Sequence, residues 1–529
     1  MLPLSASAAE YYVAPGGDDG AAGSQAAPWE TLQFAAEHVA PGDTVNVEAG
    51  SYAGFQLETA GTPEGRISFV ATGEVVIDAD GPTGDGIRLQ NVGNVTIDGF
   101  AIEGVSGRGI AHRGATPDAP SFNIELRNNA ISGTGEEGMY LSQVAMSLIE
   151  DNEVLGTGEG GAALQGHCIY LANAGSDDTT FRGNHLSGCL IAGIHFNGDA
   201  SIGGDGVISG ITIEGNLIEN TGQNGINMDG VQDSRVVNNI IRGNAGNGLR
   251  AYAIDASQGP RGLVIVNNTI HVPSDAGWCV RITEEEGDGG SVLFNNILLH
   301  DSGDGGGAVA LDGTPGFSSD FNVVTGRLSP DRGDTILDLL GWRGLGYGSG
   351  SMTASVDETF VDASAGDYGL LGRAAAVDFG QDMFAAESAP THDHNGNTRP
   401  QGDAIDAGAL ERCPDPNTCE DPGDTGGEGG GTDDTGGAES GDTGGGTSGG
   451  ETGDSSSADG SAGMSEGTSG GGPSGGGEAD ESGTDGGPEQ AGEAGGCAVV
   501  ASRNGRGGGV ASLLVFLGLA AYRRRSPEA

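Results

Sequence analysis

Two recurring patterns, with no helical periodicity between them, predict an all-β fold, a right-handed parallel β-helix. The first is a five-residue pattern that recurs every 23 to 32 residues, from Gly86–Gln90 to Ala308–Asp312. Its second and fourth residues are almost always apolar, which is typical of a half-buried strand. A second strand-like segment recurs about 15 residues from the first, from Val95–Phe100 to Phe317–Val323. Repeats of this length, joined by Gly-rich corners, indicate short strands stacked coil upon coil.

An asparagine marks the second segment of each repeat after the first one. Asn tolerates left-handed backbone and hydrogen-bonds locally, so it suits a tight turn between two short strands. Stacked on like residues of neighbouring coils, its amide can form a ladder along the axis. We therefore expect a structural role for these residues: Asn129, Asn152, Asn184, Asn216, Asn239, Asn268, Asn296 and Asn322.

The N-terminal end of such a stack needs a cap, because open strand edges invite aggregation. Pro28–Val39 is the amphipathic helix candidate of the first hundred residues, and it lies where a cap is needed. We expect it to form a capping helix on the first coil.

Both ends of the repeat resemble a known family. Tyr11–Tyr52, with a strand, a Gly/Asp-rich loop, the helix and a "PGDTV" strand, resembles the opening of secreted right-handed β-helix proteins of the pectate-lyase-like superfamily. Phe360–Leu371 and His392–Glu411 resemble their closing segment. The resemblance implies the fold from Tyr11 to Glu411. It implies no single activity, because the superfamily includes lyases, hydrolases, epimerases and non-enzymes.

Composition divides the 529 residues into four parts. Residues 1–9 look like the remnant of a secretory signal peptide, and residues 10–412 form the predicted β-helix. Residues 413–496 are an acidic Gly/Ser/Thr-rich tract with almost nothing to bury, which predicts a disordered, extended linker. Residues 497–529 form a C-terminal sorting or anchor segment with a short hydrophobic helix. The net charge of -53 argues against nucleic acid as a partner.

The C-terminal segment has the features of a protein-sorting signal. Cys497 follows two glycines and precedes the apolar run Val510–Tyr522 and three arginines. The run is shorter than the roughly twenty residues of a permanent membrane span. This order resembles the surface-sorting signal of myxobacterial proteins, which implies that Cys497 is the processing or lipid-attachment site. An ordinary tail anchor is the alternative. We expect an exported monomer held at the cell surface or outer membrane by this tail, or released from it by processing.

Export also permits disulfides. Cys413 and Cys419, six residues apart, are expected to pair. Cys168 and Cys189 either form a second disulfide or are two small buried residues. Cys279 has no evident partner.

The residue between the two apolar positions of each pattern should face outward, so parallel stacking predicts one exterior row. That row reads Arg88, Ala111, Tyr140, Tyr170, His195, Asn227, Arg250, Arg281 and Ala310. The next outward position adds Ser142, Ala172, Asn197, Asp229, Tyr252 and Thr283. The longest loops, within 156–166, 174–179 and 198–210, fall beside the centre of these rows, where long insertions commonly build binding walls.

These groups suit chemistry on an acidic polysaccharide. Elimination from a uronate needs a neutraliser for the carboxylate, a base for the C5 proton and an acid for the departing oxygen. His195 and Tyr170 can transfer the protons, and Asn227 and Arg250 can hold the carboxylate. Arg250 is also a candidate base, because the chain has no lysine. Tyr140, Asn197, Asp229, Tyr252 and Arg281 are expected to bind substrate, with His167 as support. C5 epimerisation would use the same set.

Several alternatives stay open. Asp199 and Asp205 could bind Ca²⁺, the one cofactor that the sequence suggests. Asp229 with either of them could support hydrolysis, which needs two carboxylates facing one bond. The rival from another class is a non-catalytic glycan-binding adhesin on a flexible stalk, since exposed Tyr and Arg are common in carbohydrate-binding grooves.

Overall fold

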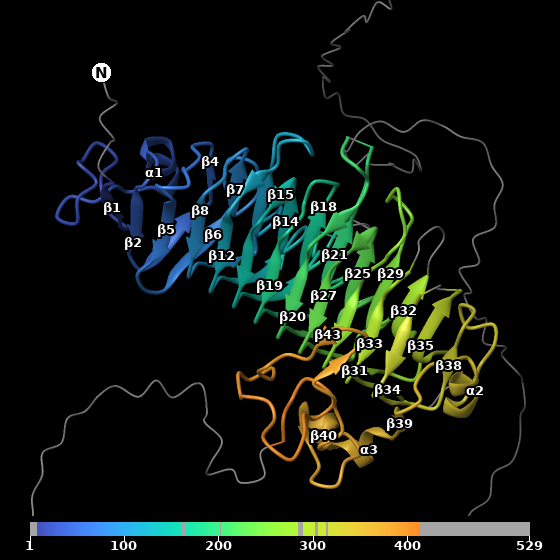
Figure 1. The fold of residues 1–529 in the computed structure, drawn as a ribbon. Coiled ribbons are helices and arrows are strands. Elements are labelled where there is room, and N and C mark those ends of the chain that lie inside the picture. The colour runs from blue at the N-terminus through green and yellow to red at the C-terminus, as the bar shows by residue number, and fades with distance from the viewer. Residues whose placement is uncertain are drawn as a thin grey trace, which may run out of the picture. The chain divides into compact units, whose positions relative to one another are not determined.

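The computed structural model describes residues 8–160, 165–201, 203–283, 289–301, 305–313 and 316–412. In this part, three long parallel sheets wrap around one apolar core (Figure 1). We call them the first sheet, the turn sheet and the site sheet. The first sheet contains, in order, β1 (Glu10–Val13), β2 (Thr44–Val47), β5 (Ile67–Ala71), β8 (Val95–Asp98), β12 (Ile124–Arg127), β16 (Leu148–Glu150), β19 (Thr180–Arg182), β23 (Thr212–Glu214), β27 (Arg235–Val237), β30 (Val264–Val266), β33 (Val292–Phe294) and β36 (Ser318–Asp320).

The other two sheets follow the same axis. The turn sheet contains β3 (Gly50–Ala53), β6 (Val75–Ala79), β9 (Ala101–Glu103), β13 (Ala130–Thr134), β17 (Glu153–Thr157), β20 (His185–Ser187), β24 (Leu217–Glu219), β28 (Ile240–Arg242), β31 (Thr269–Val272), β34 (Ile297–His300), β37 (Val323–Val324) and β39 (Met352–Thr353). The site sheet contains β4 (Phe55–Leu57), β7 (Ile87–Gln90), β10 (Ile110–Arg113), β14 (Met139–Ser142), β18 (Ile169–Ala172), β21 (Ile194–Asn197), β25 (Ile226–Asp229), β29 (Leu249–Tyr252), β32 (Trp278–Thr283), β35 (Gly307–Asp312) and β38 (Leu328–Ser329). Each coil therefore adds one strand to each sheet.

The five-residue pattern forms the strands of the site sheet, as predicted. Ile194 and Phe196 of β21 are fully buried, and β21 pairs in parallel with β18 and β25. The apolar positions fill the core because successive side chains of a strand point to opposite faces. Two short pairs, β11 (Ser121–Phe122) with β15 (Val144–Ala145) and β22 (Ile208–Ser209) with β26 (Val231–Gln232), extend the coils beside this sheet.

The predicted asparagine ladder is present between the first sheet and the turn sheet. From Asn129 to Asn322, each Nδ2 donates to the Oδ1 of the next ladder asparagine at 2.9–3.0 Å. These side chains are fully or almost fully buried. The expectation of left-handed backbone at these residues is wrong, since the left-handed conformation falls on the residue before. Asp151, Asn238 and Asn267 have φ of 54°, 55° and 53°. The chain turns there, which directs the following amide into the core.

Both ends of the solenoid are capped by short helices. The predicted N-terminal helix is shorter than expected and forms α1 (Leu32–His38), with Thr31 Oγ1 accepting from Phe34 N. It does not begin at Pro28, because Trp29 is held extended by backbone hydrogen bonds to Tyr12 and Ala14. At the other end, α2 (Leu339–Gly344) places the buried Trp342 against the last coils (Figure 1).

The segment that follows folds back along the outside of the coils (Figure 1). It contains α3 (Val356–Thr359), β40 (Phe360–Asp362), the 3₁₀ turn η1 (Ala363–Ala365), β41 (Asp367–Leu370), β42 (Met383–Phe384) and β43 (Glu387–Ser388). Arg235 pairs with Glu387 at 2.9 Å, and Asn267 donates to Asp406 O at 3.0 Å. A buried ion pair joins Arg399 to Glu411 within the segment. Through these contacts the segment packs on the first sheet and on the turns that join it to the turn sheet, away from the site sheet.

Of the cysteines, Cys168 and Cys189 form a disulfide with a Cα–Cα distance of 5.5 Å. The disulfide links residues 21 apart in the sequence. Of the two alternatives for these cysteines, a disulfide or two small buried residues, the structure therefore shows the disulfide. Cys279 is a buried free thiol. The predicted Cys413–Cys419 pair, Cys497 and the apolar run of the tail lie outside the described residues. Within the described ranges, no helix has the length and apolar character to cross a membrane.

Candidate functional site

The predicted row is aligned in register on the site sheet. Ladder pairing joins Tyr140 to Tyr170, Tyr170 to His195, His195 to Asn227, Asn227 to Arg250 and Arg250 to Arg281. We call these six residues the site row. Neighbouring strands lie about 4.8 Å apart, so the row extends over about 24 Å along the solenoid. It is less exposed than expected, since Asn227 is only 5% exposed.

A second row of side chains supports the first, and we call it the corner row. Each member directly precedes the Gly or Cys that opens the five-residue pattern: Asp85, Arg108, Glu137, His167, Ala192, Asn224 and Asn247. All except Ala192 are polar, and most are more than nine-tenths buried. Of this row, only His167 was predicted from the sequence. The available signal was a polar residue at a constant offset before each strand.

The N-terminal end of the site row is aromatic, and one of the two arginines beside it is neutralised. Arg108 and Arg113 lie 4.8 and 4.9 Å from the centroid of the Tyr140 ring. Arg108 also forms ion pairs with Glu136 and Glu137. Arg88, which precedes Tyr140 in the exterior row, is paired with Asp85 at 3.0 Å, so its charge is already neutralised.

Three aromatic rings meet at the centre of the row. The His195 ring stacks on His167 with centroids 4.5 Å apart, and it meets Tyr170 edge to face at 4.7 Å. Burial lowers the pKa of His195 to about 4, and burial together with His195 lowers the pKa of His167 well below its usual value. Burial raises the pKa of Tyr170, although a hydrogen bond from Asn197 opposes the shift. All three groups are therefore neutral at neutral pH.

The structure gives Asn227 a different role from the predicted one. Its Oδ1 accepts from Asn224 Nδ2 at 2.8 Å, and its Nδ2 lies 3.2 Å from His195 Nδ1. Buried and occupied in this way, the amide orients His195. The amide is therefore not available to hold a carboxylate, although the sequence predicted that role for it.

Asp229 also differs from its prediction as a substrate ligand. It is 2% exposed, and its carboxylate accepts backbone N–H groups of residues 254–256. It therefore anchors a loop that carries the exposed Asp255, which the sequence analysis missed. Asn197 lies within reach of the row, since its Nδ2 contacts Tyr170 Oη and Asp255 Oδ2, both at 3.2 Å.

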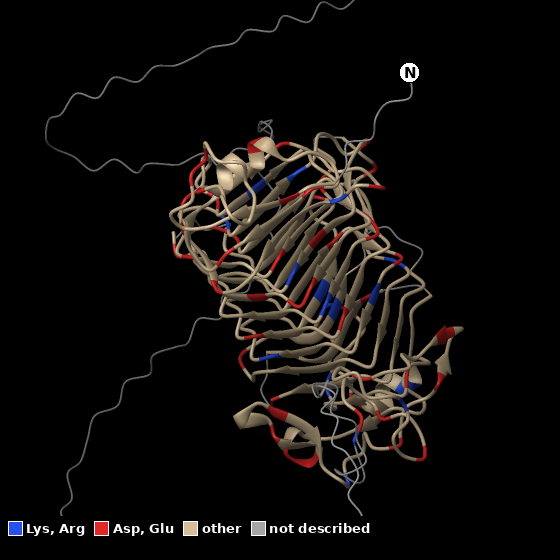
Figure 2. Cartoon of the chain, turned by 90° about the vertical axis from the view of Figure 1, so that its left-hand side faces the viewer, with Lys and Arg blue, Asp and Glu red and all other residues tan. Residues whose placement is uncertain are grey.

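The C-terminal half of the row is cationic and unneutralised. In the described part of the chain, neither Arg250 nor Arg281 forms an ion pair, and the buried Nε of each has no hydrogen-bond partner. The Arg250 guanidinium lies over the ring of Tyr252 at 4.4 Å, which places this predicted binding residue beneath it. Burial, Arg250 and Arg332 lower the pKa of Arg281, and the carboxylate of Asp312 opposes the shift. Figure 2 shows several basic positions on strands near the middle of the molecule, with other basic positions toward both ends and acidic positions among them. This pair is suited to bind an anion.

The predicted Ca²⁺ ligands bond within their own loop. Asp199 accepts from Ser201 N and Oγ, both at 2.7 Å, and Asp205 Oδ1 accepts from Val207 N at 3.2 Å. Over the described ranges, no three His, Cys, Asp or Glu side chains are grouped as a metal would require. The same loop reaches the site, because Asp199 bridges to Ala256 in the loop that Asp229 anchors.

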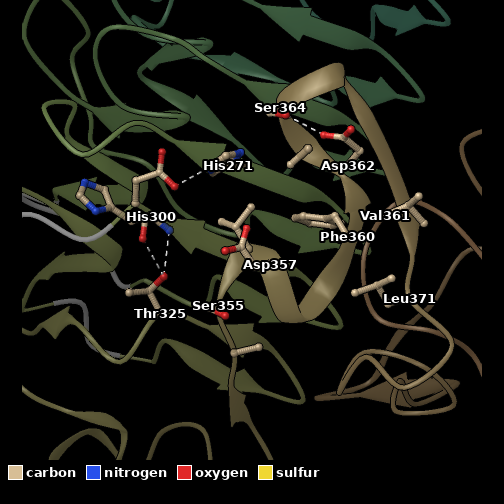
Figure 3. A pocket seen from close by; sticks show the side chains of 14 residues that line it. His271, His300, Thr325, Ser355, Asp357, Phe360, Val361, Asp362, Ser364 and Leu371 are labelled. Atoms are coloured by element: carbon tan, nitrogen blue, oxygen red, sulfur yellow. Dashed lines mark hydrogen bonds and ion pairs between the residues drawn. The ribbon is translucent and has the colours of Figure 1, made fainter. Parts of the chain in front are cut away.

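A cavity of about 680 Å³ lies elsewhere, between the turn sheet and the C-terminal segment (Figure 3). Its lining includes His271, Asp301 and Asp362. His271 is bonded to Tyr368 Oη at 2.6 Å and to Asp301 at 2.9 Å, while Asp362 bonds to Ser364. These three groups are occupied, although both ring nitrogens of His300, which also lines the cavity, lack a hydrogen-bond partner among the described residues. The site row remains the better candidate because His195 and two arginines without an ion pair lie there in one register.

The family model described as "Right handed beta helix region" matches residues 77–204 and 163–323. The fold is a right-handed parallel β-helix. Among solved structures, this β-helix is similar to pectate lyase Pel9A, with 14% identity and a TM-score of 0.54 over 77% of this chain and 97% of that one. It is also similar to the A-module of the mannuronan C-5 epimerase AlgE6 of Azotobacter vinelandii, with 16% identity and a TM-score of 0.39 over 59% and 90% of the two chains.

A curated relative is the uncharacterized protein YwoF of Bacillus subtilis (strain 168), 25% identical over 252 residues. The alignment covers 44% of this β-helix chain and 46% of the relative, so it spans about half of the relative's length. Identities this low describe a shared fold and leave the activity to be argued from the site.

Proposed function

We propose that this β-helix acts on an acidic polysaccharide that contains uronates, either by β-elimination or by C5 epimerisation. The observation that carries the proposal is the Arg250–Arg281 pair, which has no neutralising carboxylate among the described residues and lies in one row with His195 and Tyr170. In a chain with a net charge of -53, two adjacent cations that form no ion pair among the described residues favour an anionic ligand. The shared fold with a pectate lyase is consistent with this substrate class.

The polymer would lie along the row, parallel to the axis of the solenoid. A reacting sugar over Asn227 would have His195 on one side and Arg250 on the other, each about 5 Å away along the sheet. Arg250 binds its carboxylate with a bidentate hydrogen bond, and Arg281 binds the carboxylate of the next sugar. Neutralising the carboxylate makes the C5 proton easier to remove.

Both reactions begin with the loss of the C5 proton. In elimination, the electron pair forms a C4–C5 double bond and the C4 oxygen departs with a proton. In epimerisation, a proton returns to C5 from the opposite face. Tyr170 and His195 are the groups placed to handle these protons and the charge that develops.

The test uses the full chain and a panel of uronate polysaccharides. Unsaturated ends are followed by ultraviolet absorbance, and exchange of deuterium from D₂O into C5 is followed by NMR. A signal in either assay that Tyr170→Phe abolishes supports the proposal, because this variant keeps the ring contacts with Tyr140 and His195. No signal in either assay on any polymer would overturn it.

A binding function without turnover is the second candidate. It is favoured by the neutral state of Tyr170 and His195, since neither offers a ready base at neutral pH. An adhesin should lose affinity with Arg281→Gln and keep it with His195→Ala. An enzyme should lose turnover with His195→Ala while largely keeping affinity.

We also propose export, anchoring of a monomer at the cell surface through the C-terminal tail, and processing or lipid attachment at Cys497. Cell fractionation of the wild type and Cys497→Ala tests this, and an unchanged surface fraction would count against it. A Ca²⁺ requirement through Asp199 and Asp205 is tested by adding EDTA to the polysaccharide assays.

A further inference from the structure

A chain of three asparagines connects the backbone of β32 to the imidazole of His195. Trp278 N–H donates to Asn247 Oδ1 at 2.8 Å. Asn247 donates its backbone N–H and its Nδ2 to Asn224 Oδ1, at 2.6 and 2.9 Å. Asn224 Nδ2 donates to Asn227 Oδ1 at 2.8 Å, and Asn227 Nδ2 lies 3.2 Å from His195 Nδ1. The three amides are 8%, 6% and 5% exposed, so water does not easily replace a lost bond.

Every link in this chain has a fixed direction, because a backbone N–H can only donate. Asn224 must turn its oxygen toward the N–H of Asn247, which turns its nitrogen toward Asn227. Asn227 must then present oxygen to Asn224 and nitrogen to His195. An amide nitrogen also only donates, so His195 Nδ1 accepts, and the single proton of the neutral ring lies on Nε2.

We infer that Asn224 and Asn247 are positioning residues that hold His195 as the Nε2–H tautomer, so that His195 meets the substrate as a neutral hydrogen-bond donor and not as a base. This inference deepens the proposed function and, for the role in turnover, rests on it. The tautomer itself follows from the hydrogen bonds alone.

The surroundings of the ring favour the same state. His167 and Tyr170 are the titratable groups packed against it, and both are neutral at neutral pH. Burial keeps the pKa of His195 at about 4, so the ring stays uncharged. Among the described residues, no carboxylate forms an ion pair with His195 that could draw the proton to Nδ1.

The tautomer assigns the steps of the reaction. The C5–H bond breaks and its proton passes to a base other than His195, because Nδ1 of His195 already accepts from Asn227 and Nε2 carries the ring proton. The electron pair moves toward the uronate carboxylate, where Arg250 and the Nε2–H of His195 stabilise the developing charge. A neutral imidazole can do this without giving up its proton.

The test replaces a single donor of the asparagine network, the Nδ2 of Asn224, by an oxygen. Asn224→Asp keeps the shape of the side chain but leaves only acceptors, so Asn227 must turn over and present its oxygen to His195. The ring should then carry its proton on Nδ1. Full-length protein with ¹⁵N-labelled histidine rings is studied at neutral pH without substrate, by long-range ¹H–¹⁵N correlation, and His195→Gln identifies the signals of His195.

We expect the wild type to show the Nε2–H pattern in about tenfold excess or more, the ratio expected when the other tautomer leaves a buried hydrogen bond unmade. Asn224→Asp should invert the pattern, and Asn227→Asp should do so independently. Asn173→Asp is the matched control: it adds the same charge in the loop after β18, where Asn173 bonds to Ser142, and should leave the pattern unchanged.

An Nδ1–H pattern in the wild type, or an unchanged pattern in both aspartate variants, would overturn the inference. Because this readout needs no turnover, its failure is distinct from a failure of the polysaccharide assays. Where the assays show turnover, Asn224→Asp should lower kcat at least tenfold with little change in KM, as expected for the loss of an interaction made in the transition state.

Discussion

Acidification should destabilise this β-helix through His195 in particular. Burial lowers the pKa of His195 to about 4 in the folded chain, whereas an unperturbed histidine titrates at 6.5. As the pH falls below 6.5, the unfolded chain binds a proton that the folded chain does not, so the free energy of unfolding decreases. The loss begins near pH 6.5 and is complete near pH 4.

The magnitude follows from the proton balance. At pH 5 the unfolded chain carries almost one proton on this residue and the folded chain about one tenth of one. Each pH unit of full imbalance is equivalent to about 1.4 kcal/mol, so His195 alone should lower the free energy of unfolding by about 2 kcal/mol between pH 7.5 and pH 5. Part of the ring reaches solvent, which makes this figure an upper value.

The assay compares wild type and His195→Gln by urea unfolding followed by far-UV circular dichroism at both pH values. Glutamine does not titrate, and its oxygen can still accept from Asn227. Groups remote from the ring, such as Asp406, whose pKa burial raises to about 6, change stability equally in both proteins and cancel in the comparison. His167 does not cancel, because His195 helps to lower its pKa, so the difference reports the coupled pair of rings. The wild type should lose about 2 kcal/mol more than the variant. An equal loss in the two proteins would refute the argument that His195 is desolvated and neutral.

Three further outcomes are expected. Asn216→Ala should lower the free energy of unfolding by about 2–5 kcal/mol in urea titrations, because two buried backbone groups lose their partner, and a loss below about 1 kcal/mol would contradict the ladder's role. Cys168→Ser with Cys189→Ser should cost about 3 kcal/mol in non-reducing buffer, and reductant should destabilise only the wild type. Arg281→Gln should lower kcat/KM on an acidic polymer about 10- to 100-fold, while Arg88→Gln, whose cation is already paired, should not; equal effects would contradict anion binding at the pair.

The register of the site row was accessible from the sequence for a simple reason. Side chains of a strand alternate with period two, and each coil adds one strand, so apolar pairs such as Ile194 and Phe196 fix which residue faces out. The same repetition predicted the asparagine ladder, because a residue that recurs at one offset in every coil must stack on its own kind. Both features depend on local geometry repeated along an axis, which a sequence records directly.

The role of each residue in the site row depends on contacts between coils. Whether an arginine is free depends on which carboxylate lies beside it, and Arg88 and Arg281 look alike in sequence although only the first is paired in the described structure. The sequence predicted that Asp229 binds substrate, but in the structure its carboxylate accepts N–H groups from a loop that begins 25 residues later. The protonation of His195 is set by amides on the following coils.

The sequence by itself therefore determined the solenoid, its core and the order of residues along the site row, since these follow from periodicity. Only the tertiary structure decided which of those residues are free to meet a ligand and in which protonation state. Charge pairing, desolvation and hydrogen-bond direction depend on three-dimensional neighbours, and the neighbours of a coil lie 23 to 32 residues away in the chain.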